Sequence, residues 1–314
     1  MSNTYSIKSA SEAMKPQPPL DYIIDKLITN PSVNIFYGES GSKKTYTMIN
    51  MAVCVANGKD WLGFKTKQSP VLIIDEESRE KRLLKRINET VKGEEIKHVD
   101  NIYYICLAGF KLDNDEDAKK IESEIKNTKS KLVIFDALTD IMDGDENSKK
   151  DVQPVMNALG KIADNTGASL IVIHHSNKGG GYRGSSTIKG SSDLMVFISS
   201  NIDDKTINFE IEKNRDGNFN AWAAEASWTK DATNEDVFSL NQVYVDKMGE
   251  RERYVLEYLR DNGEALLADI ANNSKIIKPQ QIKKTVYQLA KEKKIYRTNP
   301  ETGNKGAKYN LLTK

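Results

Sequence analysis

The sequence predicts an α/β protein, with a mostly parallel β-sheet flanked by helices and a small C-terminal domain. Two observations lead to this fold class. Five continuous apolar runs, typical of strands buried on both faces, are separated in several places by amphipathic helical patterns. Near residue 247 this alternation gives way to three helical patterns and two short strands. At 314 residues the chain is long enough for one large domain and one small module without disulfides.

The elements are expected in the following order. Residues 1–20 are polar, end in Pro16, Pro18 and Pro19, and predict a flexible arm. Residues 21–246 then form the α/β domain and residues 247–314 the C-terminal domain. After the strand and helix around residues 33–57, the predicted parallel strands are 71–75, 102–107, 132–136, 170–174 and 194–198, with helices at 80–91, 115–127 and 152–166. Alternating patterns at 206–213, 221–228 and 237–241 predict antiparallel strands at one edge of the sheet.

The composition sets limits on cellular location and partners. The net charge is only +1, but residues 249–314 hold 14 Lys or Arg against 8 Asp or Glu, whereas the preceding residues hold 32 against 37. This asymmetry favours a polyanionic partner for the C-terminal part. Cys54 and Cys106, the only cysteines, fit buried thiols in a reducing compartment. Without a secretory leader or a long apolar run, a soluble, cytoplasmic protein with no membrane partner is expected.

The most informative motif connects the apolar strand that begins at Val33 to the following helix. A glycine- and serine-rich loop at a helix N-terminus directs backbone N–H groups towards phosphates, while a lysine and a hydroxyl meet phosphate oxygens and Mg²⁺. A plain turn before a helix is the alternative. Lys43 stands where this pattern has its second glycine, so it must adopt a glycine-like backbone conformation. The expected phosphate-binding residues are Gly38, Glu39, Ser40, Gly41, Ser42, Lys43, Lys44 and Thr45.

Acidic residues follow two of the predicted strands. Asp136 ends a buried strand, a position suited to holding Mg²⁺ opposite Thr45. Glu76 and Glu77 follow the strand at 71–75, which can lie beside the phosphate strand. We expect Glu77 to be the general base that polarises the attacking water. Glu76 is the close competitor, and solvated loop acids are the alternative for both.

The strand at 170–174 leads into adjacent histidines and a glycine-rich loop. Neighbouring strand residues point to opposite faces, so His175 is expected to face the nucleotide while His174 packs or caps. In the loop, Lys178, Arg183 and Lys189 are spaced among glycines and hydroxyls, a composition suited to the phosphates of a nucleic acid strand. A surface loop without such a role is the alternative.

A Lys-x-Arg pair, Lys213 and Arg215, ends the alternating strand at 206–213 just before a turn. Long cations on a sheet-edge turn are well placed to reach the active site of a neighbouring subunit and to stabilise charge on a transferring phosphoryl group. Ordinary surface charges are the alternative.

In order, these motifs read GESGSKKT, IIDEE, LVIFDA, IVIHHSNK with RGSSTIKGS, and EKNRDG. The set resembles the RecA-like ATPase superfamily, most closely the RepA/DnaB-type hexameric helicases of plasmids and phages, over roughly residues 20–240. The resemblance implies a RecA-like fold and ATP sites between the subunits of a ring whose pore loops bind single-stranded DNA. It also implies that Glu77 is the catalytic base, Asp136 the metal-site aspartate, His175 the sensor, and Lys213 and Arg215 the trans-acting pair.

The C-terminal pattern of three helices and a hairpin is similar to a winged helix. Residues 250–260 and 265–272 predict two short helices, and Pro279 opens a third with Ile282, Val286 and Leu289 inward. The residues expected to meet DNA are Gln280, Lys283 and Lys284 on this helix, with Lys305 and Lys308 on the wing. An oligomerisation or partner-docking module is the alternative.

The expected function is that of an ATP-driven DNA-processing motor, most closely a replicative helicase of a plasmid, phage or other mobile element. It implies ATP and Mg²⁺ as cofactors. Single-stranded DNA, duplex DNA and other replication proteins are the expected partners, and the protein is expected to be a homo-oligomer, most simply a hexamer. A recombinase or strand-annealing factor that forms filaments is one alternative. An ATP-switched DNA-binding regulator or loader without motor activity is the other.

Overall fold

The computed structural model describes residues 9–97, 99–176, 184–217, 221–243, 250–274, 279–303 and 306–312. The chain divides into two compact units, Met1–Tyr244 and Val245–Lys314. In the described residues, no helix is long and apolar enough to cross a membrane.

Nine of the strands that the structure describes form one sheet at the centre of the larger unit, in the order β11-β10-β9-β8-β3-β7-β6-β4-β5. The six strands from β8 to β5 pair in parallel, and β9, β10 and β11 extend the edge beyond β8 in antiparallel fashion. The expected α/β fold with a mostly parallel sheet is therefore confirmed. The strands are β3 (Ser32–Gly38), β4 (Val71–Asp75), β5 (Ile102–Cys106), β6 (Leu132–Asp136), β7 (Ser169–His175), β8 (Leu194–Ser199), β9 (Thr206–Asn214), β10 (Trp222–Lys230) and β11 (Asp236–Val243).

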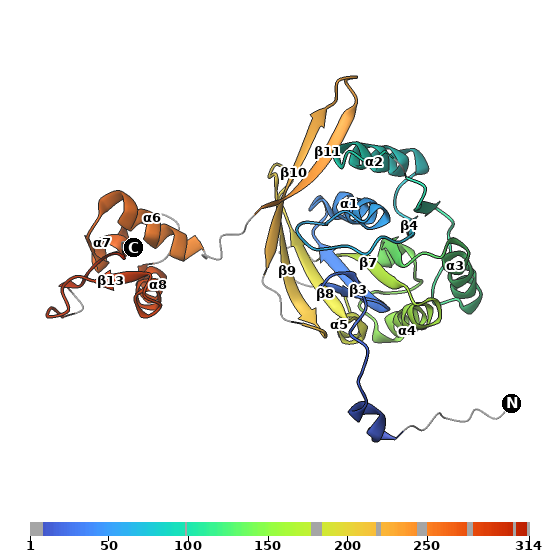
Figure 1. Ribbon diagram of the computed structural model, residues 1–314, viewed down its shortest axis with the longest axis horizontal. Helices are drawn as coiled ribbons and strands as arrows, with labels where there is room; N and C mark the ends of the chain where they lie inside the picture. The colour runs from blue at the N-terminus through green and yellow to red at the C-terminus, as the bar shows by residue number, and fades with distance from the viewer. Residues whose placement is uncertain are drawn as a thin grey trace. The chain divides into compact units, whose positions relative to one another are not determined.

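Helices cover both faces of this sheet (Figure 1). One face packs against α1 (Lys44–Asn57) and α2 (Glu80–Gly93), and the other against α3 (Asp115–Thr128), α4 (Lys149–Thr166) and α5 (Ser186–Ser191). Alternate residues of β3 supply the two cores, because Phe36 belongs to one and its neighbours Ile35 and Tyr37 to the other. A short hairpin of β1 (Tyr22–Ile24) and β2 (Ile28–Thr29) precedes β3, and the 3₁₀ helices are η1 (Ala10–Met14) and η2 (Leu138–Asp140).

Two expectations about the larger unit are wrong. β4 does not lie beside β3, because β7 and β6 separate them and β4 instead pairs with β6. Apolar strands look alike in sequence, and nothing local fixes their order. Cys54 is buried in α1, but Cys106 is only partly covered, because β5 is the last of the described strands on that side of the sheet.

In its described residues, the smaller unit has three helices and a three-stranded antiparallel sheet in the order β12-β14-β13. Its core contains Val255, Ile270, Ile282, Val286 and Leu289, so the three predicted inward residues of the third helix are buried. The helix predicted at 265–272 is partly wrong, since its first two residues form β12 and pair with β14. The elements are α6 (Glu250–Asn262), β12 (Ala265–Leu266), α7 (Leu267–Asn272), α8 (Pro279–Lys291), β13 (Ile295–Arg297) and β14 (Lys308–Leu311).

Candidate functional site

The loop between β3 and α1 has the shape of a phosphate cradle. It runs from Gly38, the last residue of β3, to Lys44, the first residue of α1. Gly41 has a φ of 83° and Lys43 a φ of 65°, which confirms the expected glycine-like backbone at Lys43. The first N–H groups of α1 have no partner within the helix, so this end of α1 is suited to bind an anion.

Lys44 lies inside this loop. Its side chain is buried, and Nζ donates hydrogen bonds to the backbone oxygens of Gly38 at 2.9 Å and Glu39 at 2.8 Å. Burial lowers the pKa of Lys44, while the nearby carboxylates of Asp136, Glu77 and Glu39 act in the opposite direction. The ammonium group is therefore held at the floor of the loop, where it can meet phosphate oxygens.

Thr45, in the first turn of α1, faces Asp136 at the carboxyl end of β6. The Thr45 hydroxyl donates to Asp136 Oδ2 at 2.7 Å, while Asp136 Oδ1 is buried without a hydrogen-bond partner among the described residues. Burial raises the pKa of Asp136 to about 7, with a further contribution from the charge of Asp75. An unsatisfied buried carboxylate oxygen beside a hydroxyl fits a hard cation such as Mg²⁺.

Within the described residues, no group of three or more His, Cys, Asp or Glu side chains gathers as a metal cage. A Mg²⁺ ion held by Thr45 and Asp136 would thus take its remaining ligands from phosphates and water, as is usual for this ion in nucleotide sites.

Asp75 is a site residue that the sequence reasoning missed. It ends β4 in register with Asp136 at the end of β6, and it is as buried as its neighbour. Its Oδ1 accepts the backbone N–H groups of Glu77 at 3.0 Å and Ser78 at 2.6 Å. Asp75 therefore fixes the turn that carries Glu77. The signal was present, because both aspartates occupy the same position at the end of an apolar strand.

The two candidate bases have different surroundings. Glu76 is turned away, since its carboxylate accepts the backbone N–H groups of Ala108 and Gly109, each at 2.8 Å. Glu77 is exposed and lines the same cavity as Lys44. Only Glu77 is thus placed to act on a water molecule beside a bound phosphate.

The adjacent histidines at the end of β7 differ in their burial. His174 is fully buried, with Nδ1 3.8 Å from Glu146 Oε2. His175 is half-buried and lines the cavity. Burial lowers the pKa of His175, and the charge of Lys44 lowers it further. A neutral imidazole can both donate and accept a hydrogen bond, which suits a contact to phosphate.

These residues meet in one cavity of about 370 Å³. Five residues of the phosphate loop line it together with Glu77, Asp136 and His175, whereas Gly38, Glu39 and Ser42 do not. The five are Ser40, Gly41, Lys43, Lys44 and Thr45. One wall was not predicted: Arg86 of α2 lies 5.5 Å from the ring centroid of Tyr46, and the Trp228 ring meets Tyr46 edge-on at 5.4 Å. Arg86 and Trp228 reach the cavity from elements with no motif, so the sequence held no local signal for them.

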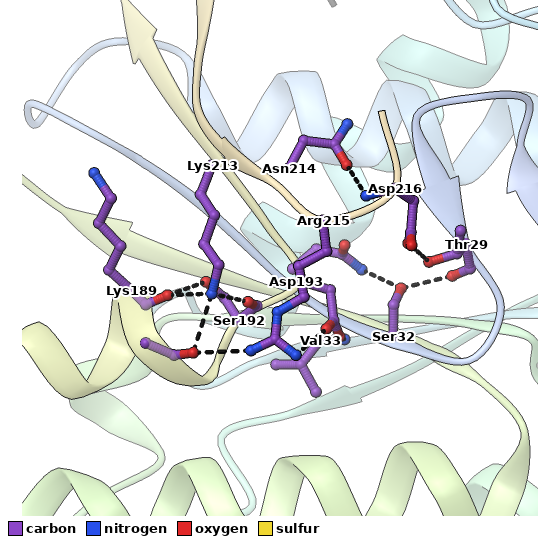
Figure 2. A network of polar contacts seen from close by, with 12 residues as sticks. Thr29, Ser32, Val33, Lys189, Ser192, Asp193, Lys213, Asn214, Arg215 and Asp216 are labelled. Carbon is purple, nitrogen blue, oxygen red and sulfur yellow. Dashed lines mark hydrogen bonds and ion pairs between the residues drawn. The ribbon is translucent and has the colours of Figure 1, made fainter. Parts of the chain in front are cut away.

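Lys213 and Arg215 do not line this cavity. Figure 2 shows both cations directed at the end of α5. Lys213 Nζ donates to the backbone oxygens of Lys189, Gly190 and Ser192, at 2.6, 3.0 and 2.5 Å. Arg215 donates to the oxygen of Gly190 at 3.0 Å and lies 3.5 Å from the carboxylate of Asp193.

This network lies at the opposite end of the sheet from the phosphate loop. Asn214 pairs with Leu194 and Leu194 with Asn34, near the start of β3, whereas the loop follows its end at Gly38. Gly38 is four residue steps along β3 from Asn34, which is roughly 13 Å. The two cations thus do not reach the phosphate loop of their own chain in this structure.

The predicted nucleic-acid contacts are distributed as follows. Lys189 forms an ion pair with Glu212 at 3.2 Å, and Lys308 forms one with Glu264 at 2.9 Å. On α8, the three predicted contacts are exposed. Lys178, Arg183 and Lys305 lie outside the described residues. The exposed predicted contacts of α8 are Gln280, Lys283 and Lys284.

Comparison with known families agrees with this geometry. A family model described as an AAA domain matches residues 3–181, which is more than half of the chain and includes the phosphate loop, Glu77, Asp136 and His175. A comparison with curated proteins gives no match.

Proposed function

The chain belongs to the AAA-domain family of P-loop ATPases, and on this basis we propose that it is an ATP-driven DNA-processing motor. In its most specific form, the proposal is a replicative helicase of a plasmid, phage or other mobile element. A P-loop ATPase domain binds its nucleotide with a divalent metal, usually Mg²⁺. When bound, that ion would neutralise phosphate charge during phosphoryl transfer.

One observation carries the ATPase part of the proposal. Lys44, Thr45, Glu77, Asp136 and His175 come from four separate segments and meet in a single cavity. In this proposal Lys44 and the N-terminus of α1 bind the phosphates, Thr45 and Asp136 would hold the ion, and Glu77 polarises the attacking water. His175 contacts the terminal phosphate, so the loop after β7 responds to its loss. The aromatic and guanidinium groups of Tyr46, Trp228 and Arg86 form a wall suited to a planar base.

Two further observations support the DNA-motor part. The ordered motif set resembles the RepA/DnaB-type helicases, in which neighbouring subunits share ATP sites. Lys213 and Arg215 lie away from the cavity of their own chain, which agrees with a role in the site of a neighbour. A closed hexamer with single-stranded DNA in its pore is the assembly that we propose.

The smaller unit supports contact with duplex DNA. α8 has no acidic residue and exposes Lys283 and Lys284, whereas α6 contains four acidic residues beside three arginines and α7 contains Asp269. Positive charge is thus concentrated on α8, as in modules that place one helix against the phosphate backbone. We propose that this unit is a winged helix that uses α8 for DNA.

Steady-state ATP hydrolysis with no DNA, single-stranded DNA or duplex DNA tests the proposal, with Lys44→Ala as the control for contaminating activity. We expect hydrolysis that single strands stimulate strongly and that Lys44→Ala abolishes. Unwinding of a forked duplex would then identify a helicase. Filaments on single-stranded DNA, seen by electron microscopy, would instead identify a recombinase. Nucleotide binding without turnover under every condition would contradict a motor and favour the ATP-switched regulator.

A further inference from the structure

The turn between β8 and β9, residues 200–205, lies against the phosphate loop. Ile202 of this turn lines the nucleotide cavity. A Cβ atom added to Gly41 would lie 3.1 Å from Ile202 Cγ1, so the turn and the loop approach closely. Since the side chain of Ile202 is 79% exposed, packing alone does not hold it there.

The Lys43 side chain connects the two segments. Its Nζ donates to Ser200 Oγ at 2.8 Å and to the backbone oxygen of Asn201 at 2.7 Å. Ser200 continues the connection, because its hydroxyl donates to the backbone oxygen of Thr206 at 2.8 Å, at the start of β9. Hydrogen bonds from an ammonium group are among the stronger ones in proteins.

This connection gives a physical reason for a lysine at a left-handed position. Glycine would adopt the φ of 65° without steric strain but has no side chain that could reach the turn. Lysine is strained in this conformation, but its side chain forms two charge-assisted hydrogen bonds with the turn. The acidic groups Asp203 and Asp204 lie on the same turn and interact favourably with the ammonium charge.

We propose that Lys43 is a positioning residue that fastens the β8–β9 turn to the phosphate loop, so that Ile202 covers the bound nucleotide and slows its release. The inference deepens the proposed ATP site and rests on nucleotide binding there. Its rival is that Lys43 is a second lysine for the phosphates. In the structure its Nζ is bonded to the turn, which favours the fastening role.

The first test needs no nucleotide and uses the full chain. Hydrogen–deuterium exchange of residues 199–206 is compared in wild type, Lys43→Met, Ser200→Ala and the double variant. We expect faster exchange in both single variants, and in the double variant an increase smaller than the sum of the two, because each single variant already lacks the hydrogen bond between Lys43 and Ser200. Lys43→Arg should restore slow exchange.

Lys205→Met is the matched control, because Lys205 is on the same turn and makes no side-chain hydrogen bond or ion pair with the part of the chain that the structure describes. Exchange in this control should equal that of wild type. Unchanged exchange in Lys43→Met would overturn the proposal whether or not the protein binds nucleotide.

The second test measures release of methylanthraniloyl-ADP by stopped-flow fluorescence. Lys43→Met and Ser200→Ala should each speed dissociation about three- to tenfold, with little change in association. Weaker binding in Lys43→Met but not in Ser200→Ala would overturn the proposal in favour of direct phosphate contact. If wild type binds no nucleotide, the proposed ATPase fails, whereas the exchange experiment still decides whether Lys43 holds the turn.

Discussion

At the scale of residues, surroundings rather than residue type separate the carboxylates of the site. Glu76 and Glu77 are adjacent in sequence, yet the Glu76 carboxylate accepts two backbone N–H groups, whereas Glu77 lines the cavity. Asp75 and Asp136 occupy equivalent positions at the ends of β4 and β6. Asp75 accepts hydrogen bonds from two backbone N–H groups, whereas Asp136 accepts one from the Thr45 hydroxyl. Each of these four carboxylates therefore has distinct contacts, and single substitutions can test their roles one at a time.

Glu77→Gln should lower the rate of ATP hydrolysis about 10²- to 10⁴-fold, because glutamine cannot accept the proton of the attacking water. Binding of ATP should remain close to that of wild type. Hydrolysis and binding are measured separately, by phosphate release and by fluorescent nucleotide. Glu76→Gln is the matched control and should hydrolyse ATP normally, since its carboxylate faces Ala108 and Gly109. The same loss in both variants would contradict the assignment of the base.

The nucleotide- and metal-free protein should lose stability as the pH rises from roughly 4 to 7. Burial raises the pKa of Asp136 from 3.8 to about 7, so in this range the folded state keeps a proton that the unfolded chain has released. The free energy of unfolding therefore falls with rising pH and levels off above 7. The whole effect is at most about 4 kcal/mol.

Urea unfolding of wild type and Asp136→Asn at pH 5 and pH 8, without Mg²⁺, measures this effect. The variant should gain stability relative to wild type at pH 8 because asparagine does not titrate. If the free energy of unfolding changed with pH by the same amount in both proteins, the pKa of Asp136 would not be raised, and the prediction would be wrong.

At the scale of elements, local periodicity predicted the strands and helices well, because buried parallel strands and amphipathic helices leave patterns within a few residues. The strands at 71–75 and 132–136 have the predicted bounds. What failed depends on partners distant in sequence. β4 lies beside β6 rather than β3, and β12 exists because Ala265 and Leu266 pair with β14. The sheet also brings Trp228 to the cavity across about 180 residues of chain.

Close packing of α2 against β11 should make Gly93 intolerant of a side chain. A Cβ there would lie 1.8 Å from the backbone oxygen of Phe238, so the helix or the strand must move. Gly93→Ala should lower the free energy of unfolding of the larger unit by about 1–3 kcal/mol. Gly160→Ala is the matched control inside α4, where an added Cβ would have no described atom beyond its own helix backbone within 4 Å, and it should raise stability by about 1 kcal/mol. Calorimetric unfolding measures both variants. The packing argument would be contradicted if both variants changed the free energy of unfolding in the same direction.

The exposed lysines of α8 should support binding to duplex DNA. Replacing both Lys283 and Lys284 by alanine removes two cations from a helix without acidic residues. We expect weaker binding and a slope of log affinity against log salt that is smaller by about 2. Fluorescence anisotropy at several salt concentrations measures both. An unchanged slope would favour the partner-docking role for this unit.

At the scale of the whole molecule, the larger unit holds the entire cavity, and the smaller unit has a hydrophobic core of its own. We therefore expect residues 1–244 and 245–314 to fold as separate fragments. The larger fragment should bind ATP with the affinity of the full chain, whereas the smaller one should bind duplex DNA. Circular dichroism, nucleotide titration and DNA titration of each fragment check this. An unfolded smaller fragment would mean that its core is not sufficient by itself.

The positions of Lys213 and Arg215 limit the symmetry of any assembly in which they serve another copy. Donor cations and acceptor cavity lie at opposite ends of one sheet. The contact is then head-to-tail, with different surfaces on its two sides, and a twofold axis cannot relate the partners through it. In an open row of such copies, the cavity of one terminal copy has no neighbour to supply the cations. In a closed ring, every cavity has such a neighbour. Ring closure would therefore add one complete site without adding a subunit, so activity per subunit should increase when the row closes.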